Sequence, residues 1–385
     1  MTACAPGALT PDQEPTETST PSPTPVEPPE PEPLSFSMSV MGDWLPHDSV
    51  IWDAEDGAGG YDFAKFTDSI RHLWEGDEAV YCNQEVTTAE SLPHAGFPRF
   101  NSPPALAEGM EEAGCNIIGL GNNHMYDNGQ RGVDETLDVW DALNPLLVAG
   151  ANRSPEDQQR VAFAEIDGIS VAFLNLITMS NQGSNGYALD FLTDAALRQS
   201  LMAQAAEADV TIVAAHWGDE YSHQVSAFQR EYAQILVDEG ADVIVGTHPH
   251  VVQPVEWLPK EDGTEALVFY SLGNFVSTQM TVPRLIGQLG QFDVTVDDGT
   301  VTIDNARQVP TYMHFDLTPA DYVNNNWRNR VNLQVHPLWE AEEPLARSAW
   351  RNDVTVESLY ADFTSWAGEE IPIVRSAEEA AQYAG

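Results

Sequence analysis

The chain has 385 residues, 42% of them hydrophobic, which is enough for one large α/β domain or two ordinary ones with a sizeable core. Its 60 acidic and 16 basic residues give a formal net charge of -44, which argues against nucleic acid or an anionic membrane surface as a partner. Such a surface would also repel an anionic substrate, unless local positive charge such as a metal ion captures it. Adaptation to high salt is an alternative explanation of the acidity.

The N-terminal segment has the features of a surface anchor. Cys4, in Met-Thr-Ala-Cys, resembles the end of a bacterial lipoprotein signal, in which the Cys is lipidated. The charged and apolar segments that precede such a Cys are missing, so we expect a truncated chain or a misplaced start codon; the alternative is an ordinary early cysteine. Residues 11–33 are mostly Pro, Thr, Ser and Glu, which predicts a disordered tether. We therefore expect an extracytoplasmic protein that touches the bacterial membrane only through its lipid anchor.

Strand and helix patterns alternate after the tether. Leu34 to Val40 alternates apolar residues with Ser, which predicts a strand. Further buried strands are predicted at 79–82, 116–120, 169–176, 210–215, 242–245 and 266–270. Helical spacing occurs at 63–73, 106–113 and 133–140, and around Leu197/Leu201 and Tyr232/Leu236. This order predicts an α/β fold with much parallel sheet.

The last third of the chain gives weaker signals. Residues 292–303 predict a hairpin turned by Asp298-Gly299, so some antiparallel sheet is expected as well. Beyond about residue 317 the pattern weakens into polar, Trp-containing segments. We therefore divide the chain into a tether (1–33), a main domain (34–316) and a C-terminal extension of uncertain arrangement (317–385).

Metal-type side chains follow five of the predicted strands. The sequence GLGNNHMYDNG, residues 119–129, crowds Asn, Asn, His and Asp where a strand ends, although Asn, Asp and Gly also suit an ordinary turn. The other strand ends carry Asp43, Glu85, His216 and the pair His248 and His250. Because the carboxyl ends of parallel strands share one edge of a sheet, we expect these side chains to converge. Imidazoles, carboxylates and an amide oxygen suit a pair of divalent transition ions, with one carboxylate able to bridge them.

Six ordered motifs between about Ser39 and Phe275 resemble the CapA-like poly-gamma-glutamate capsule biosynthesis proteins. They are Met-Gly-Asp43, Asn-Gln-Glu85, Gly-Asn-Asn-His124-Met-Tyr-Asp127-Asn-Gly, His216-Trp-Gly-Asp-Glu220-Tyr221, Gly-Thr-His248-Pro-His250-Val-Val-Gln and Tyr-Ser-Leu-Gly-Asn274-Phe. That family is in turn similar to the calcineurin-like metallophosphoesterases. The resemblance implies a four-layer α/β/β/α sandwich around a two-metal site.

The resemblance also implies roles for individual residues. Asp43 and His250 would be ligands of one metal, Asn123, His216 and His248 would hold the other, and Glu85 would take the bridging position. His124 would be the general acid or transition-state donor, oriented by Asp127. Phosphoesterases begin with Asp-x-His, whereas this chain has Asp43-Trp44-Leu45. Either two ions (Mn, Zn or Fe) or a single ion is therefore expected.

Other candidates stand beside these ligands. Glu220 is a candidate base or substrate contact, and Tyr221, Asn274, Arg99 and Arg131 are candidate substrate contacts; each has an ordinary structural alternative. We read His47, His72, His94, His223, His314 and His336 as ordinary histidines. Cys82 lies three residues before Glu85, and Cys115 lies eight residues before Asn123. If both strands end at one edge, the two sulfur atoms are offset by about five residues along the strands, which is too far for a disulfide, so we expect free buried thiols.

Two classes of function follow. The first is a cell-surface, metal-dependent hydrolase of phosphoesterase type in capsule or wall-polymer biosynthesis or export, acting on a phosphorylated substrate or an anionic polymer. Hydrolysis or ligation of gamma-glutamyl amides is an alternative chemistry, because metals polarise carbonyls equally well. The second class is a tethered, non-catalytic scaffold of a membrane-bound polymer synthase, which the missing Asp-x-His histidine favours.

Overall fold

The computed structural model describes residues 1–5, 7 and 32–383. The chain divides into a unit of Met1–Glu32 and a compact unit of Pro33–Gly385. The predicted tether falls almost entirely outside the described residues, while Cys4 is described as exposed with a free thiol. No helix among the described residues is both long and apolar enough to cross a membrane.

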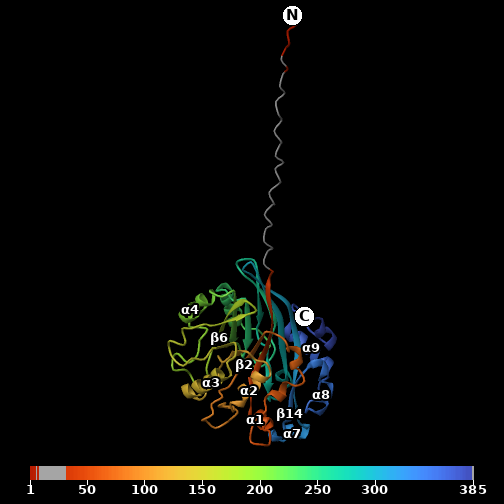
Figure 1. Cartoon of the computed structure of the whole chain (residues 1–385). Helices are drawn as coiled ribbons and strands as arrows, with labels where there is room; N and C mark the ends of the chain where they lie inside the picture. Colours follow the sequence, from red (N-terminus) through yellow and green to blue (C-terminus); the bar gives the residue numbers. More distant parts are fainter. Residues whose placement is uncertain (6, 8–31, 384–385) are drawn as a thin grey trace. The chain divides into compact units, whose positions relative to one another are not determined.

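The compact unit contains two β-sheets (Figure 1). The larger has the order β14-β13-β12-β1-β2-β3-β4, with β11 also paired to β1, and its strands are β1 (Leu34–Leu45), β2 (Ala79–Gln84), β3 (Ile117–Gly119), β4 (Leu147–Ala149), β11 (Asn274–Ser277), β12 (Ile286–Asp297), β13 (Thr300–Asp316) and β14 (Val331–Pro337). The smaller has the order β5-β6-β7-β8-β10-β9, with strands β5 (Ala162–Ile166), β6 (Ile169–Ile177), β7 (Val210–His216), β8 (Val243–Thr247), β9 (Val255–Pro259) and β10 (Glu265–Phe269). Neighbours β1, β2, β3 and β4 run parallel, as do β6, β7, β8 and β10.

Helices cover the outer faces of both sheets. The α-helices are α1 (Asp48–Ala54), α2 (Ala105–Glu112), α3 (Gly129–Leu143), α4 (Ala195–Ala205), α5 (Ala227–Asp238), α6 (Val282–Leu285), α7 (Pro319–Val323), α8 (Glu342–Arg347), α9 (Val356–Ala367) and α10 (Ala377–Ala380). Short 3-10 helices are η1 (Ala64–Thr67), η2 (Arg71–Leu73), η3 (Trp327–Asn329), η4 (Leu338–Glu340) and η5 (Ala381–Tyr383). Figure 1 shows α4 on one side of the unit and α8 and α9 on the other.

Three hydrophobic cores show the layering. On β2, Tyr81 belongs to the core between the sheets, whereas Val80 and Cys82 belong to the core that includes residues of α2, α3 and α9. On β7, Ile212 likewise faces the central core, while Val213 faces the core of α4 and α5. Alternate residues of a strand point to opposite faces, so each sheet packs on its partner and on helices. The predicted α/β/β/α sandwich is therefore confirmed.

The C-terminal segment, which the sequence pattern left unassigned, is part of this architecture. Strand β14 pairs antiparallel with β13, and Phe363 of α9 is buried in the same core as α2 and α3. The predicted hairpin is confirmed, with Asp297 paired to Thr300 across the Asp298-Gly299 turn.

Two predictions about the N-terminal half were wrong. The helix predicted at 63–73 is two 3-10 turns, η1 and η2, because apolar residues spaced by three fit a 3-10 helix as well as an α-helix. The predicted free thiols Cys82 and Cys115 form a disulfide, with their Cα atoms 5.8 Å apart.

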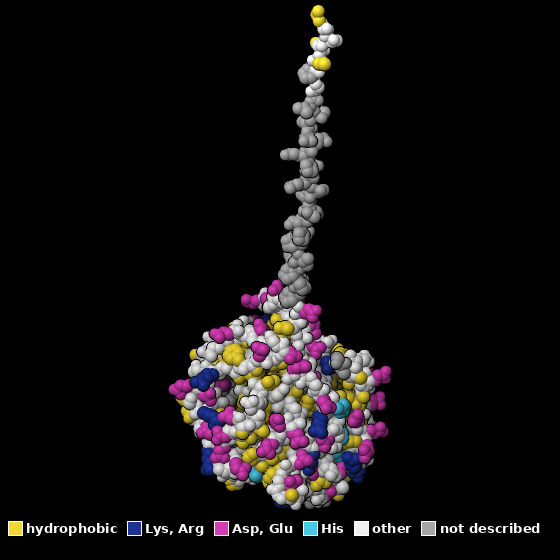
Figure 2. All heavy atoms as spheres, in the orientation of Figure 1, with side chains coloured by type: hydrophobic (Ala, Val, Ile, Leu, Met, Phe, Trp, Pro, Cys, Tyr) yellow, Lys and Arg dark blue, Asp and Glu magenta, His cyan; other side chains and the backbone are white. Residues whose placement is uncertain are grey.

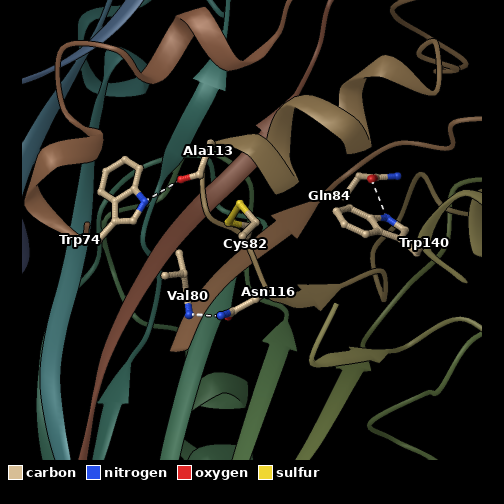
Figure 3. Close-up of a disulfide and its surroundings, with 8 residues drawn as sticks. Trp74, Val80, Cys82, Gln84, Ala113, Asn116 and Trp140 are labelled. Atoms are coloured by element: carbon tan, nitrogen blue, oxygen red, sulfur yellow. Dashed lines mark hydrogen bonds between the residues drawn. A yellow bond between two sulfur atoms is a disulfide. The ribbon is translucent and has the colours of Figure 1, made fainter. Parts of the chain in front are cut away.

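The error about the cysteines came from the strand register. Cys82 pairs with Ile118, so the offset from Cys115 is three residues and not five. The motif after Gly119 had been counted as strand, but the chain leaves the sheet there. In the turn before β3, Asn116 accepts a hydrogen bond from the Val80 backbone N–H (2.7 Å), and the Trp74 indole donates to the Ala113 carbonyl (2.8 Å) (Figure 3). The first bond ties the turn to β2 and the second ties it to the end of η2, and together they keep Cys115 within reach of Cys82.

Candidate metal centre

The candidate ligands lie where the two sheets meet. Asp43 on β1, Glu85 just after β2 and Asn123 after β3 come from the larger sheet. His216 ends β7, and His248 and His250 follow β8 in the smaller sheet. All six side chains are buried, and the Asn123 Oδ1 and His216 Nε2 atoms lie 2.7 Å apart across the junction.

Two glycines allow the strands to approach closely at this junction. A Cβ atom on Gly42 would lie 1.9 Å from the Gly273 carbonyl oxygen, and a Cβ on Gly246 would lie 2.1 Å from the Tyr270 carbonyl oxygen. Gly42 directly precedes Asp43, whose backbone N–H donates to the Gly273 carbonyl (3.0 Å). Glycine at these positions therefore brings the ligand-bearing segments together.

The ligand atoms form two groups that share Glu85. One group is Glu85, His216 and His248, and the other is Asp43, Glu85 and His250; within each group the ligand atoms lie within 4.8 Å of one another. Glu85 Oε1 is 3.7 Å from both His216 Nε2 and His250 Nε2. A carboxylate between two ligand groups is placed where it could bridge two neighbouring ions.

Glu85 carries the clearest sign that a cation belongs here. Neither of its carboxylate oxygens has a hydrogen-bond partner among the described residues, although the side chain is fully buried. Burial, and next the charge of Asp43, raise the pKa of Glu85 well above its usual range. A buried carboxylate without a partner costs free energy that a bound cation would offset. The donor set therefore fits a divalent metal.

The histidines are held in the form that a metal needs. Burial, followed by the neighbouring imidazoles, lowers the pKa of His216 well below its usual value and that of His248 to about 4. Both rings are therefore neutral near pH 7 and offer lone pairs, as metal ligands must. Thr247 Oγ1 lies 2.9 Å from His216 Nδ1, which directs Nε2 toward Asn123 and Glu85.

Neighbouring side chains also position Asp43 and His250, the members of the second ligand group besides Glu85. His250 Nδ1 lies 2.9 Å from Asp43 Oδ2 and 3.1 Å from Asn274 Oδ1. Asn83 donates to Asp43 Oδ1 (2.8 Å). Asn274 thus supports a candidate ligand directly, and Asn83 is a supporting residue that the sequence analysis missed.

The loop after β8 is strained where it carries the two histidines. His248 has φ 97° and His250 has φ 59°, both in the left-handed region that L-residues rarely adopt. Such strain persists only where the surrounding structure enforces it, and it is frequent at functional sites.

His124 is positioned beside the ligand groups. Its Nδ1 atom lies 2.8 Å from Asp127 Oδ2, which also accepts the Phe100 backbone N–H (2.9 Å). The Phe100 ring packs edge-on against the imidazole, with ring centroids 4.6 Å apart. Asn122 Oδ1 accepts the backbone N–H of His124 (3.0 Å). The imidazole is therefore fixed on several sides. Asn122 lies within the motif that carries the resemblance, whereas no motif indicated Phe100.

Of the remaining candidates, Glu220 and Tyr221 lie near the ligands, whereas Arg131 and Arg99 pair with other residues. Glu220 is exposed, but its charge contributes to the raised pKa of Glu85. Tyr221 is 43% exposed, and its ring stacks on that of His250 with centroids 6.0 Å apart. Arg131 instead pairs with Glu135 at 2.9 Å on the exposed face of α3, and Arg99 donates to Gln182 at 2.7 Å. Neither arginine contacts a candidate ligand in the described structure.

Residues 37–279 match the family model described as "Bacterial capsule synthesis protein PGA_cap". The chain is 32% identical over 207 residues to "Capsule biosynthesis protein CapA" of Bacillus anthracis, covering 51% of this chain and 48% of that protein. It is 33% identical over 178 residues to "PGA biosynthesis protein CapA" of Bacillus subtilis, covering 44% of each. The matches thus span about half the length of these curated relatives. The calcineurin-like phosphoesterase YfkN from Bacillus subtilis superposes with a TM-score of 0.45 at 13% identity, over 72% of this chain and 91% of that one.

Proposed function

Because the chain belongs to the bacterial capsule synthesis protein family, we propose that it serves biosynthesis or export of a capsule or wall polymer of poly-gamma-glutamate type, as a metal-dependent hydrolase. The observation that carries the proposal is Glu85, a buried carboxylate shared by two groups of ligand atoms and lacking any hydrogen-bond partner among the described residues. A divalent pair bound there would supply Lewis-acid stabilisation of the negative charge that develops on a transferring phosphoryl group.

The protein's own residues supply the proton. The Asp127 carboxylate accepts a hydrogen bond from His124 Nδ1–H, so the proton available for transfer is the one that a doubly protonated imidazole carries on Nε2. Phe100 and the Asn122 amide oxygen hold the ring and its backbone in this orientation. The imidazolium of His124 would then give its Nε2 proton to the leaving oxygen from a fixed position, and the ring would become neutral while keeping the Nδ1 proton.

The disulfide favours a location outside the cytoplasm. Cys82 and Cys115 are both buried and bonded, and disulfides persist mainly in oxidising compartments. Cys4, which is exposed and free, would carry the lipid anchor at the cell surface. The alternative of a tethered scaffold keeps its support from Leu45, which stands where phosphoesterases have a histidine.

The test is a phosphatase assay on a generic phosphomonoester, with and without manganese. We expect manganese-dependent turnover in the wild type and a loss of at least about a hundredfold in Asp43→Ala and His250→Ala, since each removes a ligand. His72→Ala, which removes an exposed histidine on η2, is the matched control and should retain full activity. Equal rates in the ligand variants and the wild type would refute the hydrolase and leave the scaffold.

A further inference from the structure

Arg284 lies beside the metal centre, although no sequence motif indicated it. This residue belongs to α6, and its guanidinium carbon is 3.5 Å from the centroid of the Tyr221 ring. The Tyr221 ring in turn stacks on His250 at an interplanar angle of 30°. A candidate ligand imidazole, a phenol and a guanidinium thus follow one another outward from the site.

Apart from the Tyr221 ring, the guanidinium of Arg284 has no partner among the described residues. Among the described residues, no carboxylate forms an ion pair with it and no acceptor receives a hydrogen bond from it, while its Nε atom is buried. By contrast, Arg198 pairs with Glu239 and Arg230 pairs with Glu256. An unpaired buried donor of a charged group costs free energy. In a chain with 60 acidic residues, an arginine left unpaired beside the ligands points to an anion from outside the chain.

The position of this arginine is fixed from both sides. The backbone N–H of Tyr221 donates to the Pro249 carbonyl (2.7 Å), and this bond ties Tyr221 to the loop that carries His248 and His250. The Arg284 carbonyl accepts a hydrogen bond from Asn274 Nδ2 (3.0 Å), and Asn274 Oδ1 contacts His250 Nδ1. The guanidinium is thereby held at a set position relative to the ligands before any substrate binds.

We propose that Arg284, stacked on Tyr221, binds an oxyanion of the substrate at the edge of the metal centre. The guanidinium carbon lies 3.5 Å from the ring centroid, and no acceptor among the described residues takes its N–H groups. The fork of N–H groups matches the paired oxygens of a phosphoryl or carboxylate group. The inference rests on the proposed function only in taking the substrate to be anionic. It assigns an anchoring contact, and not a bond-making step, to Arg284.

Calorimetric titration of the full chain tests this contact. The probes are inorganic phosphate and the dipeptide gamma-glutamylglutamate, and the variants are Arg284→Gln and Arg284→Lys. The matched control is Arg230→Gln, because Arg230 also lies over a tyrosine ring, at 5.4 Å from the Tyr270 centroid, but is paired with Glu256. We expect Arg284→Gln to weaken binding of at least one probe by roughly tenfold to a hundredfold, Arg284→Lys to weaken it less, and Arg230→Gln to leave it unchanged.

The results separate the sources of the oxyanion. Weakened phosphate binding identifies a phosphoryl group, and weakened dipeptide binding alone identifies a carboxylate. Equal affinity of the wild type and Arg284→Gln for both probes, or no binding of either probe to the wild type, would overturn the inference. Thermal melts of the same samples show whether each variant is folded, and Arg284→Lys provides the test if Arg284→Gln is not. Failure of the proposed function is seen separately, as absence of bound metal and of manganese-dependent turnover in the wild type.

Discussion

The Cys82–Cys115 disulfide should contribute several kcal/mol to the stability of the compact unit. The bond closes a loop of 33 residues between β2 and the turn before β3. In the chain-entropy description, a loop of this length lowers the entropy of the unfolded chain by about 12.5 cal/mol/K, which corresponds to about 3.7 kcal/mol at 25 °C. We therefore expect the free energy of unfolding of Cys82→Ala/Cys115→Ala to be about 3–4 kcal/mol lower than that of the wild type.

Equilibrium unfolding in urea, under non-reducing conditions, measures this difference. Cys4→Ala is the control, because Cys4 is exposed and unbonded, and it should unfold with the wild-type midpoint. Titration of thiols in the unfolded wild type should find one per chain, from Cys4. A difference below about 1 kcal/mol between the double variant and the wild type, or three thiols per chain, would refute the reasoning.

Three further predictions concern single side chains. Burial raises the pKa of Asp190 to about 7, so its contribution to stability is present at acidic pH and is lost as the pH rises from about 4 to about 7. Between pH 5 and pH 7, the free energy of unfolding measured in urea should fall by on the order of 2 kcal/mol less in Asp190→Asn than in the wild type. Parallel pH profiles of the two proteins would contradict this. Asp127→Asn leaves the metal ligands intact but removes the acceptor that orients His124, so turnover should fall roughly a hundredfold with unchanged metal content, and loss of metal would show a different role. Gly246→Ala should lower the free energy of unfolding by about 3 kcal/mol, because the added Cβ would clash with the Tyr270 carbonyl oxygen. If the variant unfolds at the same urea concentration as the wild type, this prediction is wrong.

The strands that carry the site could be predicted because their sequences leave little choice. Continuous apolar runs such as Val210–His216 on β7 are buried on both faces, and this is the pattern of parallel strands covered by layers on each side. Because such strands end at one edge of the sheet, their terminal polar residues could be placed together without knowing the fold in detail. Asp43, Glu85 and His216 were found on that basis.

Other features depended on geometry that the sequence does not express. The relation of Cys82 to Cys115 required the register of β2 and β3, and the point at which the chain leaves the sheet after Gly119. Arg284 lies in Thr-Val-Pro-Arg-Leu, which has no recognisable pattern, and reaches the site only because α6 joins β11 to β12 beside it. Thr247 contacts His216 across neighbouring strands, which again depends on register.

The surface charge was predictable from composition, but its consequence was not. Acidic side chains are spread over the visible face of the unit (Figure 2), as a net charge of -44 requires. Composition could not show that Arg284, beside the ligands, would have no acidic partner within the part of the chain that the structure describes. That observation needed the positions of the surrounding carboxylates.

The proposed metal centre depends on Glu85 being shared by two metal ions. The most direct measurement is elemental analysis of protein purified without chelator, for the wild type and for Glu85→Ala. We predict about two divalent transition ions per wild-type chain and loss of both in Glu85→Ala, because both ligand groups include this carboxylate. One ion per chain would contradict the bridging role of Glu85, and a wild type without metal would contradict the metal centre itself.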